Sequence, residues 1–126
     1  MNGSFDAETL RLLDETREVR IETRRDEDSP EHRTIIWVAV VEGEVFVRSV
    51  RGPQGRWHRE ISSNPEGALH VGDDRILVRA TSATDDATVD AVSAAIRSKY
   101  EKSSPGPTAA MVRPEVLPTT LELSPA

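Results

Sequence analysis

The sequence contains no cysteine, few aromatic residues and no long apolar run. The lack of cysteine excludes disulfide bonds, thiolate metal sites and cysteine nucleophiles. The longest apolar run, residues 35–41, is far shorter than the about 20 residues that cross a bilayer, and residues 1–6 show no basic segment followed by an apolar one. We therefore expect a cytoplasmic protein with no membrane contact.

The chain also lacks the excess of positive charge that polyanion binding requires. Its net charge is −6, so we expect no nucleic-acid partner. Basic residues nevertheless gather at Arg48, Arg51, Arg56, His58 and Arg59. This local cluster favours a small anionic ligand, and solvated arginines on a loop are the alternative.

A length of 126 residues and a hydrophobic share of 37% are typical of one globular domain. We therefore predict a single domain over residues 1–126. Residues 1–4 are expected to be flexible, and so are residues 103–110, where serine, proline and glycine follow one another.

Capping residues and apolar spacing predict three helices. Asp6 can cap a helix that ends near Thr16, with Phe5 packing on Leu10. A short helix fits residues 56–63, and Thr84 or Asp85 can cap a longer one that ends near residue 99.

Six segments have the composition of β-strands, namely 18–23, 34–41, 44–50, 68–71, 75–80 and 116–123. Glu42-Gly43 and the turn at 72–74 make hairpins of their neighbours. Because hairpins dominate, the order excludes a doubly wound parallel sheet. It favours an α+β fold with an antiparallel barrel and helices at its edges, and an α+β sandwich is the alternative.

Residues 33–80 resemble the flavin-binding split-barrel superfamily, which includes pyridoxamine-phosphate-oxidase-like proteins and deazaflavin-dependent nitroreductases. The likeness lies in the strand pair 34–38 and 45–49, in the short helix that ends at Asn64-Pro65, and in the strand pair 68–71 and 76–80. The whole chain resembles an uncharacterised bacterial family of small domains. The resemblance implies a six-stranded antiparallel split β-barrel with three flanking helices, assembled as a homodimer.

In such a barrel the cofactor lies between two subunits. The resemblance therefore places Arg48, Ser49, Arg51, Arg56 and Trp57 at a site for flavin mononucleotide or a deazaflavin coenzyme. Guanidinium groups bind phosphate bidentately, and an indole offers a flat wall to a ring. Alternatively, Trp57 is a core residue and Arg48 pairs with Glu44 or Glu22 across strands.

Two further residues are candidates for proton transfer. His58 lies beside the arginine cluster, and Tyr100 follows the last turn of the third predicted helix. A solvent-facing histidine and a core tyrosine are the alternatives. The three histidines have no ligand spacing, so we expect no metal site.

Three functions remain open at this point, the third being an interaction protein whose dimer surface is its function. The first is a flavin- or deazaflavin-binding oxidoreductase-like protein acting on a small molecule, with Trp37 also lining the ring pocket. The second is a cofactor-free split barrel that binds a small anionic or aromatic metabolite, or transforms it by acid–base chemistry. The segment 52–55 favours the second, because flavin-binding members of the superfamily commonly carry a basic residue and a hydroxyl residue there.

Overall fold

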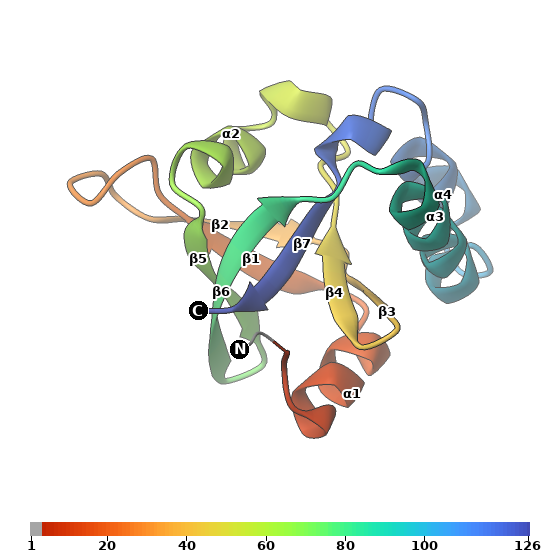
Figure 1. The fold of residues 1–126 in the computed structure, drawn as a ribbon, viewed down its shortest axis with the longest axis horizontal. Helices are drawn as coiled ribbons and strands as arrows, with labels where there is room; N and C mark the ends of the chain where they lie inside the picture. The colour runs from red at the N-terminus through yellow and green to blue at the C-terminus, as the bar shows by residue number, and fades with distance from the viewer. Residues whose placement is uncertain (1–3) are drawn as a thin grey trace.

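One curled antiparallel sheet forms the centre of the molecule, and helices lie around its edges (Figure 1). The computed structural model describes residues 4–126. The strand order is β2-β1-β5-β6-β7-β4-β3. In chain order the elements are α1 (Ala7–Glu15), β1 (Val19–Thr23), β2 (His32–Ile36), β3 (Ala39–Val41), β4 (Glu44–Val47), η1 (Gly52–Gln54), α2 (Arg56–Ser63), β5 (Glu66–Val71), β6 (Asp74–Ser82), α3 (Asp86–Tyr100), α4 (Pro105–Met111), η2 (Leu117–Thr119) and β7 (Leu121–Pro125).

The α+β class and the antiparallel half-barrel are as predicted, but the sheet has seven strands rather than six. The extra strand arises because the predicted strand 34–41 is two strands, β2 and β3, which lie at opposite edges of the sheet. The chain turns at Trp37 and Val38. There the N–H of Val38 donates to the hydroxyl of Tyr100 at 3.2 Å, and its carbonyl accepts from Nζ of Lys99 at 2.9 Å. Side chains of α3 thus satisfy backbone groups that a continuous strand would pair with a neighbour.

Four α-helices flank the sheet within residues 4–126, where three were predicted. The additional helix is α4, in the segment 103–110 that was expected to be a flexible loop. Proline breaks a helix only in its interior; at the first positions its fixed φ suits the helical turn and its missing N–H is not needed. Pro105 occupies that first position. Of the segment 1–4, residues 1–3 lie outside the described residues.

The predicted strand 116–123 is wrong in its first half: Leu117–Thr119 form η2, where Pro118 lacks the N–H that a sheet needs, and β7 begins at Leu121. The predicted helix caps and the first hairpin turn are confirmed by their local chemistry. Asp6 accepts a hydrogen bond from the N–H of Thr9 and caps α1, and Asp85 caps α3 in the same way. Glu42 and Gly43, with φ of 49° and 81°, form the turn between β3 and β4. Two consecutive residues with positive φ match the twist of a two-residue hairpin.

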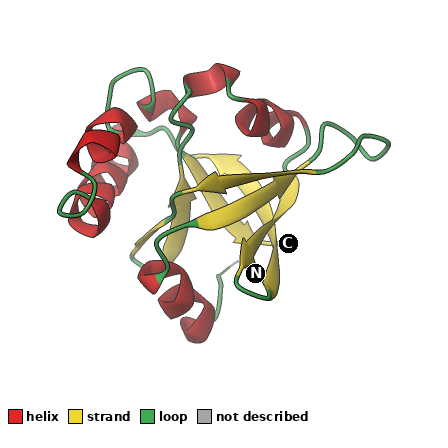
Figure 2. Ribbon diagram, turned by 180° about the vertical axis from the view of Figure 1, so that it is seen from behind, coloured by secondary structure: helices red, strands yellow, loops and turns green. Residues whose placement is uncertain are grey.

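Two apolar clusters hold the molecule together. The first fills the interior of the half-barrel, which Figure 2 shows from behind. The second joins β3 and β4 to α3 and α4. Representative buried side chains are Ile21, Val45, Leu69, Val78 and Leu123 in the first cluster, and Phe46, Val92, Ile96, Tyr100 and Met111 in the second. Within residues 4–126, no helix combines the length and apolar character needed to cross a membrane.

The close contact between β1 and β5 leads to the first prediction. A Cβ atom added to Gly67 would lie 2.5 Å from the carbonyl oxygen of Glu22, a backbone atom that cannot move aside. We expect Gly67→Ala to lower the free energy of unfolding by about 2–4 kcal/mol, measured by urea denaturation. Gly106→Ala is the control, since nothing lies within 4 Å of the added atom. Equal stability of the two variants would contradict this packing.

Candidate functional site

A cavity of about 730 Å³ opens at the seam of the half-barrel. Its walls come from four parts of the chain: edge strand β2 with Trp37, residues 48–51 after β4, residues 55–57 at the start of α2, and one face of α4. Arg17 and Glu18, which precede β1, complete the lining. The break between β2 and β3 therefore creates the opening, because it moves these strands to different edges of the sheet.

The five side chains predicted to bind a cofactor all line this cavity. They are Arg48, Ser49, Arg51, Arg56 and Trp57. Trp37, which was predicted to line the ring pocket, lies in the same wall. The lining contains four arginines, including Arg17, and one carboxylate, Glu18. The cavity is thus positively charged in a chain whose net charge is −6.

Arg48 is the most deeply buried of these arginines, with 1% of its surface exposed. Its Nε donates to Thr120 Oγ1 at 2.8 Å, Nη1 donates to Ser93 Oγ at 2.9 Å and to the carbonyl of Met111 at 3.3 Å, and Nη2 donates to the carbonyl of Val89 at 2.9 Å. All four acceptors are neutral.

No carboxylate within residues 4–126 forms an ion pair with Arg48, so the alternative that it pairs with Glu44 or Glu22 is wrong. Burial in these neutral surroundings, together with the charge of Arg97, lowers the pKa of Arg48 to about 10. A buried cation without a counter-ion is costly, and an anion in the cavity would remove much of that cost.

Ser49 and Gly55 close the loop between β4 and α2. Ser49 Oγ donates to the carbonyl of Gly52 at 2.8 Å, and the N–H of Ser49 donates to Thr119 Oγ1 at 3.0 Å. A Cβ atom on Gly55 would lie 2.6 Å from Ser49 Oγ, so a larger residue there would displace this hydroxyl from its bond to Gly52. The segment 52–55 therefore forms part of the cavity wall through a tightly folded backbone, and it carries no charged or hydroxyl side chain.

His58 and Tyr100 do not line the cavity. His58 is buried on α2, and its Nε2 has no hydrogen-bond partner among the described residues. Burial lowers the pKa of His58, and a hydrogen bond with the backbone of Thr119 partly offsets this. The alternative for His58 was a solvent-facing histidine. The structure shows it buried instead.

Tyr100 has no exposed surface, and its hydroxyl lies 2.7 Å from the carbonyl oxygen of Arg17. Its ring stacks on Trp37 with centroids 3.9 Å apart. Burial raises the pKa of Tyr100 to about 12. This geometry is that of a core tyrosine, and catalytic roles for His58 and Tyr100 stay predictions.

Comparison with known families identifies the chain. A bacterial family described as "Uncharacterized protein conserved in bacteria (DUF2255)" matches residues 9–123. The chain belongs to this family. No curated protein sequence matches it.

Solved structures similar to this DUF2255 member share its fold at low sequence identity. The heme storage protein HutZ from Vibrio cholerae has a TM-score of 0.63 and 13% identity over 98% of this chain and 91% of its own. A candidate pyridoxamine 5′-phosphate oxidase from Listeria innocua has a TM-score of 0.60 and 12% identity over 94% of this chain and 90% of its own. An F420 reductase has a TM-score of 0.58 and 18% identity over 92% of this chain and 91% of its own. The predicted likeness in fold to pyridoxamine-phosphate-oxidase-like and deazaflavin-dependent proteins is therefore confirmed.

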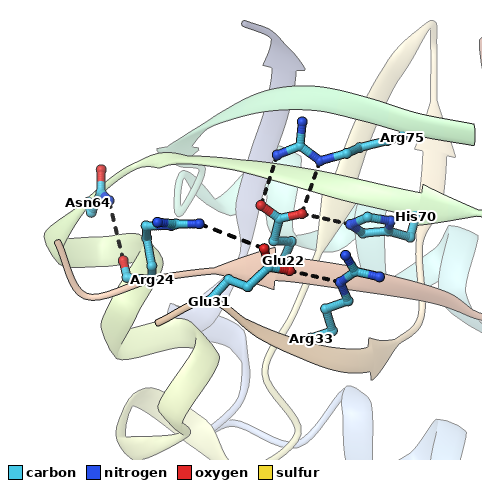
Figure 3. A network of polar contacts seen from close by, with 7 residues as sticks. All are labelled: Glu22, Arg24, Glu31, Arg33, Asn64, His70 and Arg75. Carbon is cyan, nitrogen blue, oxygen red and sulfur yellow. Dashed lines mark hydrogen bonds and ion pairs between the residues drawn. The ribbon is translucent and has the colours of Figure 1, made fainter. Parts of the chain in front are cut away.

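A second polar cluster, on the outer face of the sheet, was not predicted from the sequence. Glu22 accepts two hydrogen bonds from Arg75, at 3.1 and 2.9 Å, and its Oε1 lies 2.8 Å from Nε2 of His70 (Figure 3). Residues from β1, β5 and β6 meet here, so only the strand register could have revealed it.

A further histidine–carboxylate contact joins β2 to α2, where His32 Nδ1 lies 3.0 Å from Oε2 of Glu60. Within residues 4–126 no three histidine, aspartate or glutamate side chains gather as a metal site.

The Glu22 cluster makes stability depend on pH. The hydrogen bonds from Arg75 lower the pKa of Glu22 from 4.5 to about 2, against the opposing effect of burial. A lowered pKa stabilises the folded state above pH 4.5, and this contribution disappears as the pH falls through about 2. We expect Glu22→Gln to remove about 2 kcal/mol at pH 6, with allowance for the half-exposed Arg75, and to lose less stability than the parent between pH 5 and pH 2.

Urea denaturation at several pH values measures this effect. Glu66→Gln is the control, because Glu66 and its partner Arg79 are both largely exposed. That control should keep the pH dependence of the parent. A Glu22→Gln variant that also keeps it would rule out Glu22 as the source.

Proposed function

We propose that the cavity binds a planar, anionic cofactor of the flavin or deazaflavin class and that the protein is an oxidoreductase acting on a small molecule. The observation that carries this proposal is Arg48, a buried guanidinium in the cavity wall whose acceptors are all neutral. Four of its five N–H groups have acceptors among the described residues, which leaves one on Nη2. The cavity volume, about 730 Å³, suits a ligand of this size.

The anionic tail would lie at the start of α2. Arg51 and Arg56 are exposed at this rim, and both line the cavity. The first turn of α2 contains no acidic residue, and Gly55 supplies no side-chain cap. The free backbone N–H groups at the start of α2 and the guanidinium groups of Arg51 and Arg56 are therefore suited to a phosphate. The indole of Trp57 offers flat apolar surface to a ring.

The lining residues also favour cofactor chemistry over acid–base chemistry. Among the described residues that line the cavity, Glu18 is the only ionisable side chain apart from the four arginines. The cavity thus offers no histidine, lysine or tyrosine as a proton donor near neutral pH. A bound flavin or deazaflavin would accept and deliver the electrons, while the protein positions the ring and excludes water.

A cofactor-free binding protein for an anionic or aromatic metabolite is the second candidate. The compact segment 52–55 favours it, because no charged or hydroxyl side chain stands there to hold a phosphate. Heme is less well supported, even though similar folds bind it. Within residues 4–126, Met111 is the only lining side chain of a type that commonly ligates heme iron.

Charge at the rim should decide ligand binding. We expect flavin mononucleotide or F420 to raise the melting temperature of the protein and to add its absorption band to the purified complex. Arg56→Gln should weaken this binding about tenfold or more, since a charge-assisted hydrogen bond contributes about 1.5–3 kcal/mol. The control is Arg59→Gln on the same helix, outside the cavity. If neither flavin mononucleotide nor F420 binds, the oxidoreductase proposal is wrong and the cofactor-free binding protein remains.

We further propose that the site lies between two copies of the chain. Two large apolar side chains at the cavity, Ile35 and Val50, are 58% and 46% exposed. A second subunit that covered them would remove apolar surface from water and would enclose the ligand.

Light scattering tests this assembly. The parent should have the mass of a dimer, and Ile35→Lys should shift it to the mass of a monomer. Leu77→Lys is the matched control, because Leu77 is 51% exposed but lies outside the cavity. A monomeric parent at working concentration would exclude a site shared between subunits.

A further inference from the structure

Arg17 is a lining arginine that was not among the predicted site residues. Its Nη1 donates to Ser103 Oγ at 2.7 Å, and its Nη2 donates to Ser104 Oγ. Within residues 4–126 it forms no ion pair with a carboxylate. The hydrogen on Nε and one on each terminal nitrogen have no acceptor among these residues. Arg17 therefore keeps three donors for a ligand.

Arg17 is exposed, and its neighbours orient the guanidinium without neutralising it. Its central carbon lies 5.8 Å from the centre of the Trp37 ring and 5.6 Å from that of Tyr100, beside the stacked pair. The hydroxyl of Tyr100 lies 2.7 Å from the carbonyl oxygen of Arg17, which fixes the backbone. A charged group that is fixed at its backbone and bound only to neutral hydroxyls is preorganised for an anion.

The position of Arg17 separates it from the arginines proposed to hold the cofactor tail. Arg17 lies in the connection between α1 and β1, whereas Arg51 and Arg56 flank η1. Figure 1 shows α1 and α2 at opposite ends of the sheet. The cavity thus receives positive charge from two separate segments of the chain. A ligand tail bound by Arg51 and Arg56 would leave the three free donors of Arg17 for a second anionic group.

We propose that Arg17 and Trp37 form a second subsite of the cavity, which binds the carboxylate of a small organic acid and places its apolar body against the indole. A planar guanidinium matches a carboxylate in two parallel hydrogen bonds. Glu18 also lines the cavity next to Arg17, and its negative charge opposes a dianionic phosphate more than a singly charged carboxylate. That the acid is the substrate of a bound cofactor rests on the proposed function; the subsite itself does not.

Calorimetric titration with benzoate and with benzamide, its uncharged counterpart, tests this subsite in the cofactor-free protein. The parent should bind benzoate more tightly than benzamide. Arg17→Gln should weaken benzoate binding at least tenfold and leave benzamide binding within twofold. Arg56→Gln, which removes a positive charge from the other lining segment, should leave benzoate binding within twofold.

Two further variants exclude a merely structural effect. Arg17→Lys keeps the charge but not the fork, and it should weaken benzoate binding three- to tenfold. Ser103→Ala combined with Ser104→Ala removes the hydroxyls that orient Arg17 but keeps its charge and its free donors, so it should weaken benzoate binding by no more than threefold. If circular dichroism shows that Arg17→Gln does not fold, these two variants test the subsite in its place.

Three outcomes would overturn the subsite: no preference for benzoate in the parent, unchanged binding in both Arg17 variants, or an equal loss in Arg56→Gln. Its failure is distinguishable from failure of the proposed function. Benzoate binding without cofactor binding would leave the subsite standing alone, whereas cofactor binding without benzoate binding would leave only the proposed function.

Discussion

The buried charge of Arg48 is the constraint on which the cavity depends. Its guanidinium joins four elements by hydrogen bonds: it extends from the end of β4 to Val89 and Ser93 on α3, Met111 on α4 and Thr120 before β7. Because each acceptor is neutral, the network orients the cation but does not cancel its charge. The wall of the cavity is thus assembled around an uncompensated positive charge, and a ligand that supplies negative charge would stabilise the fold as well as occupy the site.

The second determinant is the break between β2 and β3. Without it, residues 34–41 would form one strand and the seam would have no opening there. Lys99 and Tyr100 maintain the break through Val38, and both belong to the last turn of α3. The end of one helix therefore determines the opening of the barrel, and the stacked Trp37 carries that geometry into the cavity wall.

Local chemistry made much of this fold predictable. The caps Asp6 and Asp85 and the turn at Glu42-Gly43 act over a few residues, so their sequence signals were sufficient. The break at Val38 was not predictable, because a β-branched run has the same composition whether it forms one strand or two. The helix α4 was missed because proline marks both loops and the first turn of helices.

The candidate site divides in the same way. Resemblance placed Arg48 and its neighbours in one region, and the structure brings all five side chains to one cavity. Arg17 could not be found, since it lies far from this cluster in the sequence, and the partners of Glu22 depend on a strand register that composition does not specify.

The placement of the two tryptophans has an optical consequence. The chain contains only Trp37 and Trp57, and both line the cavity. Indole emission from this protein therefore originates entirely at the cavity walls. One indole is stacked on a tyrosine and the other lies edge-on to a histidine, so their emission should respond differently to a ligand, and unlabelled protein reports its own occupancy.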